Sequence, residues 1–146
     1  MIQPDVNVLV YAYRREAEDH AAYSAWLNGV LSGREELGLV DTVLAAFLRV
    51  VTNPRIFTKP APTADALRFV TALRTAPRAR PLHATPATWN RFAEIVRGDR
   101  AVRGNLVPDA WLAAVALSHG SRLATADRGF ARFTGLDWFE PLAEVS

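Results

Sequence analysis

Three aspartates stand where an α/β fold would gather them at one edge of a sheet. Asp5 ends the first apolar segment, and Asp127 lies two residues beyond the segment that closes at Thr125. Asp109 follows Pro108 at the start of a strongly apolar helix. Ligands of such folds bind beyond the carboxyl ends of the strands. Carboxylates that converge there repel one another unless a cation lies between them, and the hard, oxygen-binding ions Mg²⁺ and Mn²⁺ match that donor set.

A metal ion held by carboxylates suits the hydrolysis of a phosphodiester. It lowers the pKa of a water molecule, orients that water in line with the phosphorus and stabilises the leaving oxygen. Each acid also has a structural interpretation, because aspartates commonly cap helices. Asp109 is the hardest to explain in that way, since the run 110–117 that follows it is apolar almost throughout and the helix N-terminus balances its charge only in part.

Apolar periodicity and turn residues predict the elements that would position these acids. Strands are expected to end at Asp5 and to span 37–40, 80–83, 121–125 and 136–139. Helices are expected over 7–13, 19–30, 42–51, 63–73, 85–95 and 108–117. This alternation predicts an α/β fold with a mostly parallel sheet and helices on both faces. The sequence contains no repeat and no long linker, so we expect a single domain over residues 1–146.

A few residues indicate where helices begin and end. Asp19 is expected to cap the second helix, and Thr85 followed by Pro86 has the order of a cap and a first helical residue. Pro108 is expected to open the helix that carries Asp109, and Gly120 to close it.

The basic residues are nearly all arginine, and Lys59 is the single lysine among 17. Arginine suits bidentate contact with phosphate, so this bias either reflects a nucleic-acid partner or merely a genome rich in G and C. The net charge of +2 is too small to decide between these interpretations.

Composition also excludes several classes of protein. The absence of cysteine rules out disulfides, thiolate zinc sites and a cysteine nucleophile. No apolar run approaches the roughly 20 residues that a membrane span needs, and the first residues lack the features of a signal peptide. A cytoplasmic protein is therefore expected.

Four segments resemble, in the right order, motifs of PIN-domain ribonucleases. The segment 5–9 is similar to the start of PIN domains, 107–116 to the family's third motif and 123–130 to its fourth. The segment 47–55 is similar to a subgroup of VapC-type toxins common in mycobacteria. Together the four cover nearly the whole chain, which makes the resemblance far more specific than any single motif.

The resemblance implies a three-layer fold with a five-stranded parallel sheet and metal-dependent endoribonuclease activity. Asp5, Asp109 and Asp127 would bind Mg²⁺ or Mn²⁺, and Asn7 and Thr125 would be polar groups that orient the acids or water. VapC-type toxins cut tRNA or rRNA within a structured loop. They are commonly homodimers and are neutralised by a VapB-type antitoxin whose tail enters the groove of the active site.

One position departs from the family pattern. The usual second acid is a glutamate in the helix after the second strand, and Ala46 aligns with it. Asp41, about one helical turn earlier, either replaces that acid or caps the helix, and capping is the favoured interpretation. The missing glutamate also leaves open a degenerate PIN fold that binds RNA or an antitoxin without cleavage.

Other interpretations rest on weaker signals. A phosphatase with Asp5 as nucleophile would need a second acid where this chain has Asn7, and a lysine near the phosphate, for which only Lys59 is available. The tryptophans at helical positions are expected to pack in the core, and the three histidines show no metal-ligand spacing. The loop arginines Arg97, Arg100 and Arg103 either contact RNA phosphates or are simply solvated.

Overall fold

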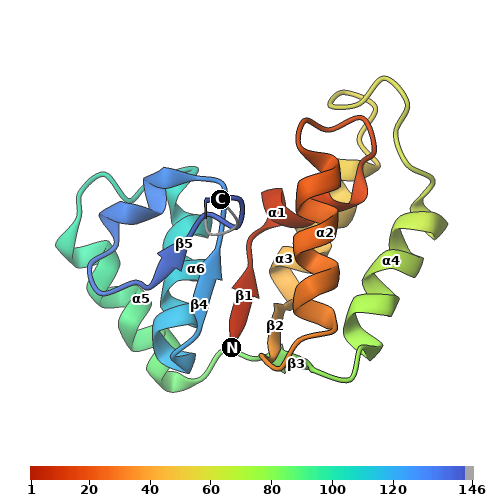
Figure 1. Ribbon diagram of the computed structural model, residues 1–146. Coiled ribbons are helices and arrows are strands. Elements are labelled where there is room, and N and C mark those ends of the chain that lie inside the picture. Colours follow the sequence, from red (N-terminus) through yellow and green to blue (C-terminus); the bar gives the residue numbers. More distant parts are fainter. Residues whose placement is uncertain (144–146) are drawn as a thin grey trace.

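The computed structural model describes residues 1–143, in which five strands form one parallel sheet. The strands are β1 (Ile2–Pro4), β2 (Leu37–Val40), β3 (Ala79–Leu82), β4 (Arg122–Ala124) and β5 (Trp138–Phe139). Their order across the sheet is β3-β2-β1-β4-β5, and every neighbouring pair is parallel (Figure 1). The predicted α/β fold with five parallel strands is confirmed.

The helices form two groups that lie on opposite sides of the molecule. They are α1 (Val6–Tyr13), α2 (His20–Leu31), α3 (Asp41–Val51), α4 (Thr63–Thr75), α5 (Pro86–Gly98) and α6 (Leu106–His119). The chain passes from β1 to β3 through α1–α4 and then returns to β4 through α5 and α6. The chain thus moves first toward the β3 edge of the sheet and later toward the β5 edge. Because crossovers between parallel strands are right-handed, these opposite directions place α1–α4 on one face and α5 and α6 on the other (Figure 1).

Two of the predicted helix boundaries agree with the structure. The Thr85 hydroxyl accepts a hydrogen bond from the backbone N–H of Thr88, and Pro86 is the first residue of α5. Gly120 ends α6 with φ 64°, in the left-handed region that favours glycine.

Two other boundary predictions need correction. Asp19 directly precedes α2, but its side chain makes no capping hydrogen bond. α6 begins at Leu106 rather than at Pro108. Pro108 is tolerated inside the first turn because a backbone N–H at that place would have no partner within the helix.

A buried polar link joins the central strand to α6. Gln3 is fully buried, and its side-chain Nε2 donates to the carbonyl oxygen of Leu112 at 3.1 Å. The hydroxyl of Ser121, just before β4, donates to Gln3 Oε1 at 2.9 Å. Both ends of the amide are thus satisfied inside the core, which fixes α6 relative to β1 and β4.

The outer face of α5 is less buried than the sequence predicted. Trp89 is 60% exposed rather than part of the core, and its ring lies against Phe92 and Trp111 at centroid distances of 5.5 and 6.0 Å. α5 packs on α6, and its other side faces water. Within residues 1–143, no helix combines the length and the apolar character that crossing a membrane requires.

Removing the Ser121 hydroxyl should destabilise the fold. In Ser121→Ala the buried Gln3 Oε1 loses its donor, so we expect urea denaturation to give a free energy of unfolding lower by about 1–2 kcal/mol. Ser32→Ala is the matched control, because the exposed Ser32 hydroxyl donates only to a backbone carbonyl of its own helix. Equal stabilities of the two variants would show that the link contributes nothing.

Candidate active site

Asp5 lies at the carboxyl end of the central strand and is held by two hydrogen bonds. It is the N-cap of α1, where Oδ1 accepts from the backbone N–H of Val6 at 2.7 Å. Its Oδ2 accepts from the hydroxyl of Thr125 at 2.8 Å. Thr125 is fully buried and follows β4, the strand beside β1. The Asp5–Thr125 bond therefore ties together the two strand ends that carry the acids.

The Thr125 hydroxyl is the centre of a wider network. Its oxygen accepts from Asn7 Nδ2 at 3.4 Å and from the backbone N–H of Asp127 at 3.0 Å. Asn7 Oδ1 in turn accepts from the backbone N–H of Ala126 at 3.2 Å. The hydroxyl thus donates one hydrogen bond and accepts two, which uses its full hydrogen-bonding capacity. The network fixes the start of α1 against the loop after β4.

The other two acids lie beside Asp5. Asp109 is half-buried, one turn into α6. Asp127 is exposed and caps the short 3-10 helix η1 (Arg128–Arg132), where its Oδ1 accepts from the backbone N–H of Gly129 at 2.8 Å. The charges of Asp5 and Asp127 both act on Asp109. The structure thus brings together all five residues predicted for the site, Asp5, Asn7, Asp109, Thr125 and Asp127.

Burial and mutual repulsion raise the pKa values of two of these acids. Burial raises the pKa of Asp5 above 3.8, the hydrogen bonds from Thr125 and Val6 oppose that rise, and the charge of Asp127 adds to it. Burial and the charges of Asp5 and Asp127 raise the pKa of Asp109 from 3.8 to about 6. No arginine or lysine within residues 1–143 forms an ion pair with these three acids, so their charge is left without a basic partner.

The oxygen donors at this edge suit a hard divalent cation, although they do not form a closed cage. Within residues 1–143, no group of three or more His, Cys, Asp or Glu side chains is placed to hold a metal ion by itself. Mg²⁺ usually takes only one or two protein carboxylates and keeps several water molecules. Burial raises the pKa of Asp109 most, and the repulsion from Asp5 and Asp127 that adds to this rise is what a cation would relieve.

Asp41 does not behave as expected. Val40 is the N-cap of α3, and Asp41 is the first helical residue and makes no capping hydrogen bond, so the capping prediction is wrong. Its side chain lies in a hollow that Arg74 and Pro81 also line, on the β3 side of β2. It is not among the charges that act on Asp5 or Asp109. Ala46 is half-buried on α3, and Asp41 does not take the place of the missing glutamate beside the three acids.

The histidines have contacts outside the acidic cluster. A ring nitrogen of His20 lies 2.9 Å from the carbonyl oxygen of Tyr11, and one of His119 lies 2.8 Å from that of His83. The loop arginines Arg97, Arg100 and Arg103 are all exposed.

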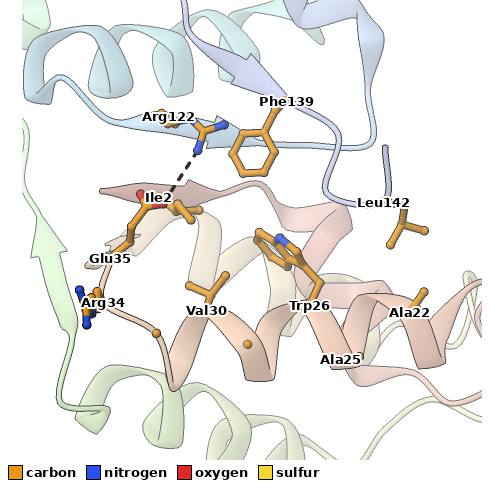
Figure 2. A pocket seen from close by; sticks show the side chains of 12 residues that line it. Ile2, Ala22, Ala25, Trp26, Val30, Arg34, Glu35, Arg122, Phe139 and Leu142 are labelled. Atoms are coloured by element: carbon orange, nitrogen blue, oxygen red, sulfur yellow. Dashed lines mark ion pairs between the residues drawn. The ribbon is translucent and has the colours of Figure 1, made fainter. Parts of the chain in front are cut away.

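An apolar groove lies apart from the acidic cluster. It has a volume of about 680 Å³ and runs between α2 and the β4–β5 side of the sheet. Figure 2 shows Trp26 and Val30 of α2 facing Phe139, with Arg122 beside the ring. None of the five predicted site residues lines it.

A contact between an arginine side chain and a distant loop is also one that no sequence pattern predicts. Arg14 donates to the backbone carbonyl of Lys59, 45 residues away. Arg14, Arg15 and Lys59 are plain in the sequence, but their spacing does not predict that they share a site.

The chain is similar to known proteins over almost its whole length. The PIN domain family matches residues 2–136. The chain is 46% identical over 142 residues to ribonuclease VapC43 of Mycobacterium tuberculosis, covering 97% of this chain and 96% of the relative. It is 35% identical to ribonuclease VapC25 of the same species, covering 94% of this chain and 96% of that protein.

Solved structures share the fold at lower sequence identity. VapBC2 from Rickettsia felis, in a complex bound to a promoter DNA fragment, superposes with a TM-score of 0.70 at 17% identity and covers 96% of this chain and 98% of that one. VapC20 of M. tuberculosis, described as a toxin that cleaves the sarcin-ricin loop, has a TM-score of 0.67 at 18% identity, with coverages of 93% and 96%.

The pKa of Asp109 predicts how the stability of the metal-free protein depends on pH. The folded-state value of about 6 lies above the ordinary 3.8. The folded protein therefore holds this proton more tightly than the unfolded chain does, and the contribution of Asp109 to stability falls as pH rises through that window. After allowance for solvent screening, ionisation of Asp109 should lower the free energy of unfolding by roughly 1 kcal/mol at pH 7.

Asp109→Asn should reveal this cost directly. In EDTA, we expect the variant to unfold at higher urea concentration than the wild type at pH 7, and the difference to shrink toward pH 4, where the wild-type carboxyl is protonated. A difference that does not change with pH would contradict the electrostatic origin of the effect.

Proposed function

Because the chain belongs to the PIN domain family, and within it to the VapC ribonucleases, we propose that it is an endoribonuclease toxin whose reaction takes place at Asp5, Asp109 and Asp127 with a bound Mg²⁺ or Mn²⁺. The observation that carries the proposal is the gathering of three carboxylates, without a basic partner in residues 1–143, at the carboxyl edge of the sheet. Such an arrangement is unfavourable for folding, and a bound cation would relieve the repulsion.

The residues of the site divide into ligands and supports. Asp5, Asp109 and Asp127 would hold the metal ion, one or two of them directly and the rest through its water molecules. When bound, the ion would supply an activated water and neutralise charge on the phosphate. Thr125 keeps Oδ2 of Asp5 in place by donating a hydrogen bond to it. Asn7 and the backbone of Asp127 are fixed by the same hydroxyl. The site is therefore rigid on the side of β1 and β4, where the acids must keep their separation.

The relatives indicate the kind of substrate and partner. VapC20 is described as a toxin that cleaves the sarcin-ricin loop, and the Rickettsia felis structure is a VapBC complex. We extend these properties to this chain: its substrate is a structured loop of tRNA or rRNA, and its inhibitor is a VapB-type antitoxin. We further propose that it acts as a homodimer in the cytoplasm, where those RNAs are found.

RNA cleavage by the purified protein is the direct test. With Mg²⁺ or Mn²⁺, we expect the wild type to convert total tRNA or rRNA into discrete fragments, and EDTA to suppress them. Asp109→Ala should lower the cleavage rate at least 100-fold, because it removes a metal-binding acid. Retention of the fold by the variant is checked by circular dichroism.

The same assay addresses the non-cleaving alternative. If neither ion supports cleavage by the wild type, and calorimetry detects no metal uptake that depends on Asp5, the chain is a PIN fold that binds without cutting. Ala46→Glu, which restores the acid that the family has at this position, is then the variant to test for recovered cleavage.

Thr125 should act on the rate through Asp5. Thr125→Val keeps the shape of the side chain but removes the hydroxyl that holds three groups, so we expect kcat to fall about 10- to 100-fold. Thr125→Ser keeps the hydroxyl and should restore most of kcat. If the valine variant cleaves as fast as the serine variant, the hydroxyl does not position the acids.

A further inference from the structure

A second groove lies between two loops at the end of the molecule toward which the strands point. It has a volume of about 1010 Å³ and is lined by residues 12–16, where α1 leads toward α2, by residues 57–62, between α3 and α4, and by Phe69. In Figure 1 the two loops lie at the top, above α2 and α4. We refer to this hollow as the basic groove.

A buried arginine builds the basic groove. The side chain of Arg14 is 9% exposed, forms an ion pair with Glu16 and donates from Nη2 to the carbonyl oxygen of Lys59 at 2.6 Å. Its guanidinium lies 4.3 Å from the centre of the Phe57 ring. Within residues 1–143 the buried Nε has no hydrogen-bond partner. One guanidinium thus joins both walls and keeps an unused donor at their junction.

The charge of the lining is positive and its walls are partly aromatic. Arg15 and Lys59 are exposed beside the buried Arg14, and Glu16 is the acid among the lining residues. The Tyr13 and Phe69 rings also line the groove, with centroids 4.9 Å apart. Cations next to aromatic rings form the combination that binds single-stranded nucleic acid, because the cations contact phosphates and the rings stack on bases.

The groove is connected to the acidic cluster by α1. Asp5 caps the start of this helix, and Tyr13, which lines the groove, is its last residue. A helix of eight residues is about 12 Å long at 1.5 Å per residue. The groove is therefore about one short helix away from the acids, a span that a few nucleotides of RNA can cover.

We infer that the basic groove binds the RNA strand that flanks the cleavage site, with Arg15 and Lys59 contacting phosphates and the rings of Tyr13, Phe57 and Phe69 accommodating a base. This inference rests on the proposed ribonuclease function. It assigns to the α1–α2 and α3–α4 loops a role in substrate affinity, and leaves the chemistry to the three aspartates.

The test measures binding of total tRNA in a background that does not cleave. Arg15→Ala with Lys59→Ala is introduced into Asp109→Asn protein, and the dissociation constant is measured by fluorescence anisotropy at several salt concentrations. Both side chains are exposed, so the fold is retained. Arg34→Ala with Arg78→Ala is the matched control, since it removes two exposed positive charges from the opposite edge, just before β2 and β3.

We expect the groove variant to bind tRNA several-fold more weakly at low salt, and the slope of log affinity against log salt to decrease by about one per lost phosphate contact, hence by about two. The control should keep the wild-type slope. With Asp109 restored, the groove substitutions should raise KM for tRNA cleavage and leave kcat nearly unchanged, which a structural defect would not do.

Two results would overturn the inference. If the groove variant and the control have the same slope and affinity for tRNA, the groove does not bind RNA. If tRNA binding is unchanged but binding of poly-L-glutamate is lost, the groove recognises an acidic protein segment instead. Failure of the ribonuclease proposal is distinguishable, because then the wild-type protein itself does not cleave tRNA or rRNA.

Discussion

The hydrogen bond from Thr125 to Asp5 is the contact on which the rest of the site depends. It joins the ends of the central strand β1 and its neighbour β4, and the same oxygen also holds Asn7 and the backbone of Asp127. Because Thr125 is fully buried, this hydroxyl has no water to replace a lost partner, and each of its bonds matters more than one at the surface. The parallel pairing of β1 and β4 is what allows one side chain to organise so many groups.

That organisation is electrostatically unfavourable for folding. Burial, together with the charges of Asp5 and Asp127, raises the pKa of Asp109 to about 6, and no ion pair with arginine or lysine in residues 1–143 relieves the three acids. Elsewhere the protein places opposite charges together, as in the pairs of Arg80 with Glu36 and Arg132 with Asp99. The contrast within one small fold separates acids that have a basic partner from the three acids to which we assign the cation.

The two grooves divide the surface in a way that follows from the topology. The apolar groove lies beside β4 and the edge strand β5, on the side of the sheet that faces α2 (Figure 2). The basic groove lies at the carboxyl end of the sheet, where the loops after α1 and α3 meet. The acids at this end follow from the rule that ligands of parallel sheets bind beyond the carboxyl ends of the strands, whereas the basic loops reach the same end because they connect α1 to α2 and α3 to α4 (Figure 1).

The sequence by itself determined the parts that local chemistry controls. The strand 37–40, the Thr85 cap, the Gly120 terminus and the alternation that leads to a parallel sheet follow from side-chain pattern and turn residues. The motifs around Asp5, Asp109 and Asp127 predicted the residues of the proposed site. Only the tertiary structure decided the properties that depend on distant neighbours. Asp41 lines a hollow beside β3 although it directly follows β2, and Trp89 is exposed because α5 is covered on one side only. Arg14 meets Lys59 across 45 residues, a contact that packing creates and that no local spacing encodes.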